Sequence, residues 1–280
     1  ESVIDKNVDI NQDIDDKPDV IDIKAISKND ITTTAKASAK GVKKDADSDG
    51  ETSETEKVLD TYSDEASTSN GDSTSSSGRQ VKVAAAVAVT DLDNKTKAII
   101  RGDTKVEVQK EGVEEGKVNI KSNAINNTET TADGSTVAKD DSDGSKAIGA
   151  AVGVNVINSS NQAIINREIS ADSVEATAEM KEDFEETTSQ ETSNFNTEVT
   201  SGAAESEVSV AGGLAVNVVD HKSEALIKDD LTLNSGDVYK LKVNAVNNTS
   251  QTAKSLPAEN ETSGARVGAG AAVAINIAKN

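Results

Sequence analysis

Apolar and polar residues alternate with period two over long stretches of the chain, and these stretches recur in blocks. This period is typical of half-buried β-strands. Each block opens with a strand of small apolar residues, continues through a turn rich in Asp, Asn, Ser and Lys, and ends in shorter alternating strands. We predict opening strands over residues 81–92, 147–157, 208–219 and 267–277, and shorter strands in the first block over 97–101, 105–109 and 117–124.

One motif lies in the opening strand of every block. It reads VAVTDLDNKTKAII from Val87, VGVNVINSSNQAII from Val152, LAVNVVDHKSEALI from Leu214 and VAINIAKN from Val273, so the copies begin at nearly regular intervals. The first three copies align without a gap through their second half. Such self-similarity indicates a repeat architecture, in which each unit stacks on its neighbours.

A second motif recurs between copies of the first. VNIKSNAINNTET from Val118 resembles LKVNAVNNTSQT from Leu241, and a weaker copy, IDIKAISKNDITTT, begins at Ile21. The two motifs divide the chain into a divergent first unit with an acidic, Ser/Thr-rich loop and four further units, the last of them partial. Their bounds are 1–80, 81–145, 146–206, 207–265 and 266–280. The chain opens at Glu1 without an initiator Met, so we expect an internal piece that begins and ends within a repeat.

Residues 173–186 carry good helix formers, but their apolar side chains alternate with period two. The aligned parts of the other units are expected to be strands, so we predict a strand here that ends in a helical turn.

The opening strand has two different apolar faces. In the unit that starts at 207, one face holds Val210, Gly212, Leu214, Val216 and Val218, and the other holds Ser209, Ala211, Gly213, Ala215 and Asn217. A strand that is apolar on both sides is normally covered on both. The Ala/Gly face is either a docking face for another layer or protomer, or a lining that fits a narrow interior, and we favour the second interpretation slightly.

Aromatic residues make up 1% of the chain, with no Trp and no Cys. Large rings usually supply much of a globular core, so a core without them must be built from many small and β-branched contacts. The mean hydropathy of −0.51 would suit a disordered chain, but the dense apolar blocks argue against disorder. Without cysteine there are no disulfides and no thiolate metal site.

The formal net charge is −21, from 50 acidic and 29 basic residues. This charge repels nucleic acid, and the basic stripe that would follow a phosphate backbone is missing. No run of 18 or more apolar residues exists, so we expect no membrane insertion of this fragment.

The repeated text, [Val/Leu]-[Ala/Gly]-[Val/Ile]-Asn-[Val/Ile] followed by a polar segment and Ala-x-Ile, resembles the repeats of giant exported bacterial adhesins. These include filamentous haemagglutinin-like proteins and fusobacterial leukotoxin-like filamentous adhesins. The likeness covers most of residues 81–280, and the unit 81–145 departs from it with Thr90 where the later units have Asn155, Asn217 and Asn276. It implies an all-β, right-handed parallel β-solenoid at the cell surface, with no catalytic residues in the repeats.

With solenoid coils of roughly 20 residues, each unit of this chain would supply about three coils. The recurring Asn could hydrogen-bond along the stacking axis as a ladder, although not a continuous one. Stacked β-sandwich-like domains of about 60 residues would show the same alternation and remain the competing fold.

Residues 45–56 satisfy the pattern of a twelve-residue calcium loop. Asp45, Asp47, Asp49, Glu51, Ser53 and Glu56 supply oxygen ligands, with Gly50 at the turn. No amphipathic helix precedes the loop, and we expect the acidic tracts at 130–144, 182–201 and 258–264 to occupy the same place between units. A solvated acidic loop is therefore the favoured interpretation and a calcium site the alternative.

The only histidine, His221, is predicted to lie in a turn, because its equivalents are Asn94 and Ser159. No nucleophile-elbow sequence accompanies it, so we expect no enzyme. The leading hypothesis is a structural or adhesive segment, a stalk or adhesin shaft, of a surface-exposed or secreted bacterial protein. The alternatives are a self-assembling extracellular filament or surface-layer subunit and a segment of an exported leukotoxin-like toxin. Expected partners are receptors on host or neighbouring cells, or other copies of the chain.

Overall fold

The computed structural model describes residues 2–4, 20–37, 81–102, 106–108, 116–136, 146–185, 188–203, 208–228, 230–233, 240–258 and 267–279. All regular secondary structure in these residues is β-strand, and every pairing between strands is parallel. The all-β prediction with parallel sheets is confirmed.

The strands form three sheets, which we call A, B and C. Sheet A contains, in spatial order, β1 (Ser2–Ile4), β3 (Val81–Arg101), β6 (Lys146–Asn166), β10 (Val208–Ile227) and β14 (Val267–Lys279). Sheet B contains β2 (Val20–Lys36), β5 (Lys117–Asp133), β8 (Ser173–Glu179), β9 (Ser193–Ser201), β12 (Lys240–Ala245) and β13 (Thr249–Pro257). The small sheet C contains β4 (Val106–Glu107), β7 (Ile169–Ala171) and β11 (Leu231–Leu233).

Equivalent residues of successive units lie side by side. In sheet A, Val87 pairs with Val152, Val152 with Leu214, and Leu214 with Val273, so the register follows the gapless alignment of the motifs. In sheet B, Ile21 pairs with Val118, which confirms that the weak first copy of the second motif is equivalent to the later one.

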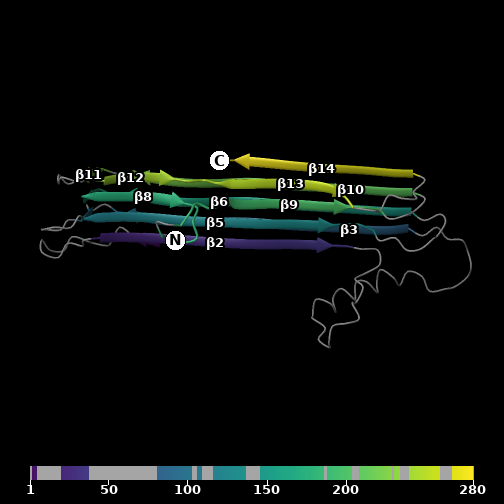
Figure 1. The fold of residues 1–280 in the computed structure, drawn as a ribbon, viewed down its shortest axis with the longest axis horizontal. Coiled ribbons are helices and arrows are strands. Elements are labelled where there is room, and N and C mark those ends of the chain that lie inside the picture. The colour runs from purple at the N-terminus through teal and green to yellow at the C-terminus, as the bar shows by residue number, and fades with distance from the viewer. Residues whose placement is uncertain are drawn as a thin grey trace, which may run out of the picture.

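Successive units add neighbouring strands to sheet A and to sheet B, which lie in order in Figure 1, and the three units from 81 to 265 each add one strand to sheet C. The chain passes from a long strand of sheet A through a short strand of sheet C to sheet B before it returns to sheet A one position farther along. One circuit therefore takes a whole sequence unit. The expectation of three coils per unit is wrong, because the strands of sheets A and B are several times longer than those of a short solenoid coil.

The polar turn predicted inside each motif is also wrong. β3, β6 and β10 run unbroken for 21, 21 and 20 residues through this segment. In β3 and β6, inward-facing polar side chains of this segment, such as Asn94, Ser159 and Asn161, form hydrogen bonds with side chains of sheet B, so the chain has no need to turn there. His221 thus lies within β10 and is fully buried.

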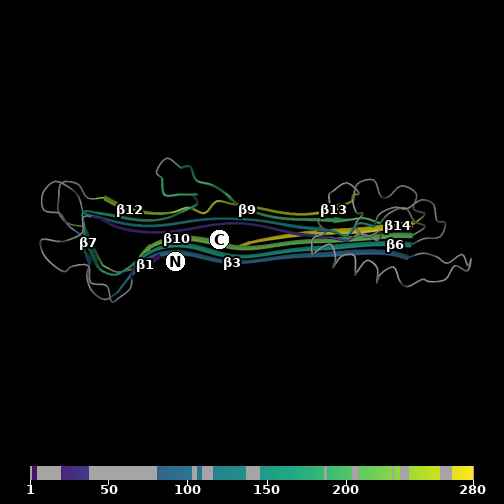
Figure 2. The ribbon, with the colours of Figure 1, turned by 90° about the horizontal axis from the view of Figure 1, so that it is seen from below.

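The region 173–201 differs in part from the expectation. The strand is confirmed as β8, but residues 180–185 form no helix. A further strand, β9, follows and buries Phe195 and Val199 in the interior. Placing 182–201 between units was therefore wrong. The segment 180–192 separates two strands that both pair with β5, and its described residues, 180–185 and 188–192, stand out from sheet B (Figure 2).

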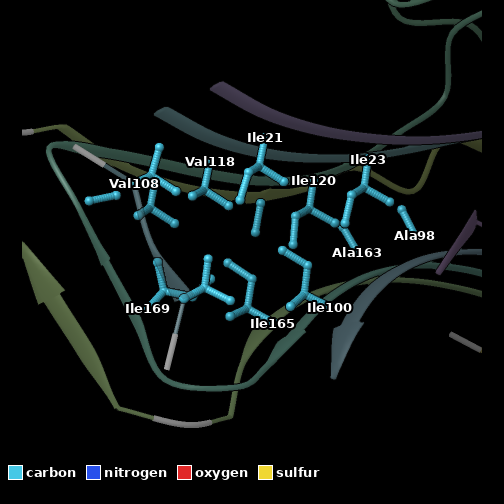
Figure 3. Packing of buried hydrophobic residues seen from close by; sticks show 14 of the residues in the cluster. Ile21, Ile23, Ala98, Ile100, Val108, Val118, Ile120, Ala163, Ile165 and Ile169 are labelled. Carbon is cyan, nitrogen blue, oxygen red and sulfur yellow. The ribbon is translucent and has the colours of Figure 1, made fainter. Parts of the chain in front are cut away.

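Sheets A and B face each other across a thin interior, and the two layers lie farther apart at the β7 end than at the β14 end (Figure 2). The sequence matches this taper. Isoleucine and valine side chains fill the wide end, where Ile120 of sheet B lies opposite Ile100 and Ile165 of sheet A (Figure 3). Alanine fills the narrow end, where Ala86, Ala88, Ala151 and Ala215 pack beside Val199.

Inward-facing glycines mark the closest approach. A methyl group on Gly149 of β6 would lie 2.0 Å from the carbonyl oxygen of Gly202, and one on Gly153 would lie 2.8 Å from a methyl of Val199. The second interpretation of the Ala/Gly face is the one that holds: these small residues line a narrow interior, and they are not an outer docking face.

We predict that Gly149→Ala lowers the free energy of unfolding by about 1–3 kcal/mol, because the added methyl collides with backbone that cannot rotate away. Gly212→Ala in β10 is the matched control, since a methyl there meets nothing within 4 Å. The control should leave stability unchanged or raise it by up to about 1 kcal/mol. Urea denaturation of both variants checks this, and equal effects of the two substitutions would contradict the assigned faces.

Candidate functional site

The six residues of the predicted calcium loop, 45–56, lie outside the described residues, and the calcium site stays a prediction. Within the described part of the chain, no cluster of three or more His, Asp or Glu side chains is arranged to hold a metal ion.

His221 is held in an apolar setting inside the structure. Its ring lies 5.9 Å from the ring of Phe195, and among the described residues neither imidazole nitrogen has a hydrogen-bond partner. Burial lowers the pKa of His221 to about 4, against a smaller opposing effect of Asp220. The imidazole is therefore neutral at pH 7 and has no contact with solvent, which suits a core residue and not an acid–base catalyst.

The positions equivalent to His221 form a buried polar column in the earlier units. Asn94 donates a hydrogen bond from Nδ2 to Oδ1 of Asn126 at 2.8 Å, and Asn126 donates from Nδ2 to Oγ of Ser159 at 2.9 Å. These bonds cross from sheet A to sheet B and satisfy side chains that would otherwise be costly to bury. In the unit 207–265 the equivalent position is His221, which has no such hydrogen bond.

The recurring Asn of the first motif lies in a second polar column. Nδ2 of Asn155 lies 2.7 Å from Oγ1 of Thr128 and 3.2 Å from Oδ1 of Asn217, and Asn217 donates to the carbonyl oxygen of Phe195 at 2.8 Å. Among these bonds only the Asn155–Asn217 contact follows the stacking direction. The predicted Asn ladder is thus limited to one step in the described residues, and the other bonds hold sheet A to sheet B.

The outer face of sheet B carries charges that pair with one another. Glu175 accepts a hydrogen bond from Nζ of Lys242 at 2.6 Å and forms an ion pair with Lys121 at 3.1 Å. Burial raises the pKa of the Glu175 carboxyl, but the hydrogen bonds from Lys242 and Lys121 outweigh burial and hold this pKa below its ordinary value.

These side chains form the floor of a shallow hollow of about 360 Å³ beside the 180–192 insertion. Phe184 of the insertion is part of its lining, and Lys28 of β2 forms an ion pair with Glu182 of the same insertion. The lining contains four lysines and three glutamates. Because opposite charges pair across the floor, the hollow offers a ligand no concentrated charge of one sign.

The outer face of sheet A is the opposite in character. On four neighbouring strands the outward residues over the same stretch are apolar, except for Asp91 at one end of β3, and we call the apolar set the apolar face. It comprises Val83, Ala85, Val87, Val89, Ile148, Ala150, Val152, Val154, Val156, Val210, Gly212, Leu214, Val216, Val218, Ala269, Ala271, Val273, Ile275 and Ile277.

Exposure establishes which side of β3 faces solvent. Val87 is 63% exposed and Val89 is 56% exposed, whereas their neighbours Ala86 and Ala88 are 4% and 1% exposed. The larger apolar residues are therefore outside and the smaller ones inside. Sequence reasoning identified both faces but expected cover on both, and among the described residues nothing covers the apolar face.

Comparisons with protein-family models, with curated proteins and with solved structures find no match to this chain. The described residues contain no candidate for a membrane-spanning helix.

We predict that His221 makes the protein sensitive to mild acid. Its folded-state pKa lies below the ordinary value of 6.5, so the unfolded chain takes up the proton first as pH falls. The contribution of neutral His221 is complete above about pH 6.5 and is lost toward pH 4, which amounts to about 2 kcal/mol between pH 7 and pH 5.

The check is urea denaturation at both pH values, with His221→Leu as the variant that lacks this dependence. Proton NMR of the single imidazole gives its pKa directly, because the chain has one histidine. A midpoint near 6.5, or equal pH dependence of the wild type and the variant, would overturn the assignment.

Proposed function

We propose that this chain is a structural, adhesive repeat segment of a surface-exposed or secreted bacterial protein. Its units would wind as a right-handed parallel β-solenoid in which one coil corresponds to one sequence unit. The observation that carries the proposal is the register: equivalent residues of four units, such as Val87, Val152, Leu214 and Val273, pair in a row across sheet A. Units that stack in this way bury together a surface that none buries alone.

The chemistry of the described side chains supports a structural role over catalysis. Inward polar groups such as Asn126 and Asn155 bond to other protein groups, and the carboxylate of Glu175 is paired with lysine. These groups are engaged in holding the two sheets together and in keeping the outer face of sheet B soluble. The resemblance of the motifs to exported adhesin repeats supports a location at the cell surface, with receptors on other cells as partners.

Each unit adds more to the area of the sheets than to the length of the stack. Stacked strands lie about 4.8 Å apart, so each additional unit lengthens the stack by only about 4.8 Å. A strand of 21 residues extends about 70 Å at right angles to the stack. Each unit therefore adds little length to a shaft and much area to two broad faces, through which we propose that the segment makes its contacts.

A self-assembling extracellular filament or surface-layer subunit is the second candidate. The specific observation in its favour is the apolar face of sheet A, which is wide and solvent-exposed in the single chain. The Ala/Gly face is internal and cannot join copies, so such a filament would have to form through the larger apolar side chains on the outside.

We predict that an additional unit is tolerated. A second copy of residues 146–206, inserted after Ser206, should fold in register and leave the melting temperature unchanged or higher, because an inner unit is covered on both sides by its neighbours. The control is the same insertion without Ala151, which moves the rest of the strand by one residue and turns its apolar face inward. Thermal melting followed by circular dichroism should separate the two, and equal melting curves would contradict in-register stacking.

We also predict that the segment is displayed on cells. Antibodies raised against the purified chain should label intact cells of the producing bacterium and reduce their attachment to a surface or to other cells. Antibodies absorbed with the purified chain are the control for this labelling. Labelling only after the cells are permeabilised would contradict a surface role.

A further inference from the structure

The apolar face is large enough to form an interface. Four strands about 4.8 Å apart, over nine residues at about 3.3 Å each, give a face of roughly 600 Å² in projection. The largest apolar patch on a typical soluble monomer is about 300–600 Å², so this face lies at the upper limit. Two such faces in contact would bury roughly 1,200 Å² or more, which is the lower end of the range for stable protein–protein interfaces.

The longest stretch outside the described residues is poorly suited to cover this face. Residues 38–80 carry only four large apolar side chains, Val42, Val58, Leu59 and Tyr62, among many Ser, Thr, Asp and Glu. Covering so many apolar positions with such a stretch would bury charges without partners. A surface of the same chemistry as the face itself is a better match.

The relief of the face is self-complementary. One row across the strands consists of small residues, Ala85, Ala150, Gly212 and Ala271, and it forms a groove. A methyl group on Gly212 would meet nothing within 4 Å, so the groove is open in the single chain. The next row, Val87, Val152, Leu214 and Val273, forms a ridge of larger side chains beside it.

We propose that the apolar face binds the same face of a second copy of this chain, related by a twofold axis parallel to the stacking direction. This operation runs the strands of the two copies antiparallel. Along β3, the groove residue Ala85 comes one residue before Ala86 and the ridge residue Val87 comes one residue after it. A twofold axis at the level of Ala86 therefore exchanges the two rows and places the ridge of each copy over the groove of its partner. Ridge and groove are then filled in both copies at once, as an isologous interface requires.

The same axis also matches the charged ends of the face. Lys146 is the exposed residue at one end of the face on β6, and Asp91 is exposed at the other end on β3. The twofold axis brings Lys146 of one copy beside Asp91 of the second copy, one strand away. Opposite charges at the rim favour this orientation over the parallel one, which would place like charges together.

Sedimentation of the whole chain over a range of concentrations tests the proposal. The wild type should form dimers, and Val87→Lys with Leu214→Lys should raise the dissociation constant at least tenfold, because two ammonium groups of each copy would be buried in the interface. The matched control is Val20→Lys with Ile26→Lys, two exposed apolar residues of β2 in sheet B. Both double variants add the same charge to a chain of net charge −21, so general electrostatics alone would change them equally.

Gly212→Val is a second, independent variant. It adds apolar surface where the single chain has open space, so non-specific association would strengthen. A filled groove instead excludes the ridge of the partner, and the proposal predicts at least tenfold weaker dimers with an unchanged melting temperature in dilute solution.

Three results would overturn the proposal. The first is a wild type that remains a monomer up to about 100 μM, a concentration at which even weak specific dimers are populated. The second is equal dimerisation of the two double-lysine variants. The third is a monomeric wild type that binds phosphatidylcholine–phosphatidylglycerol vesicles through the apolar face. The dimer proposal depends on the faces of sheet A and not on display at the cell surface. The unit-insertion and antibody experiments test the proposed function, so their failure can be distinguished from failure of the dimer proposal.

Discussion

The close approach of sheets A and B is the constraint on which the rest of the structure depends. At the narrow end the two sheets pack mainly alanine, glycine and small polar side chains around Val199, and the contact expected between a methyl on Gly149 and the carbonyl of Gly202 illustrates how close the sheets are. A core of this kind contains few large rings, and among the described aromatic residues only Phe195 is fully buried. Stability must therefore come from many small contacts that are repeated from unit to unit.

This constraint also explains why the apolar face lies outside. Strands of sheet A carry apolar residues on both sides, and the thin interior accepts only the smaller set. Val87 and Val89 are consequently exposed while Ala86 and Ala88 are buried, which is the reverse of the usual preference for burying the larger apolar side chain. A face of this size is costly in water unless it is covered. The interior and the proposed interface are thus two consequences of one pattern.

Much of the fold could be predicted from the sequence because the alignment of the repeats gives the pairing register of the strands. The motifs at Val87, Val152, Leu214 and Val273 align in the sequence and pair in sheet A. The coil length could not be predicted in this way, because a polar segment between two apolar ones reads as a turn. Only the structure shows that Asn94 and Ser159 bond to Asn126 across the interior, so that the strand continues.

The faces and the insertion illustrate two other limits. Alternation indicates that two faces exist, but which one lies inside depends on the distance between sheets, which is a property of the assembled units. β9 was missed because the insertion 180–192 displaces it in the sequence from its equivalents and because polar residues flank Phe195 in the sequence. The alignment of Thr128 with Phe195 could have located it. The predicted calcium loop lies outside the described residues, and the hollow on sheet B came from the insertion and not from any motif.

The most direct test of in-register stacking uses the absence of cysteine in the chain. Asp93 and Asn158 belong to different units and are paired neighbours, both exposed, on β3 and β6. Neighbouring strands place their Cα atoms within the range of about 4.4–6.8 Å that a disulfide requires, whereas a shift of two residues places them about 8 Å apart. The account predicts that Asp93→Cys with Asn158→Cys forms an intramolecular disulfide under mild oxidation and that Asp93→Cys with Ser160→Cys does not. Equal cross-linking of both pairs, or of neither, would contradict it.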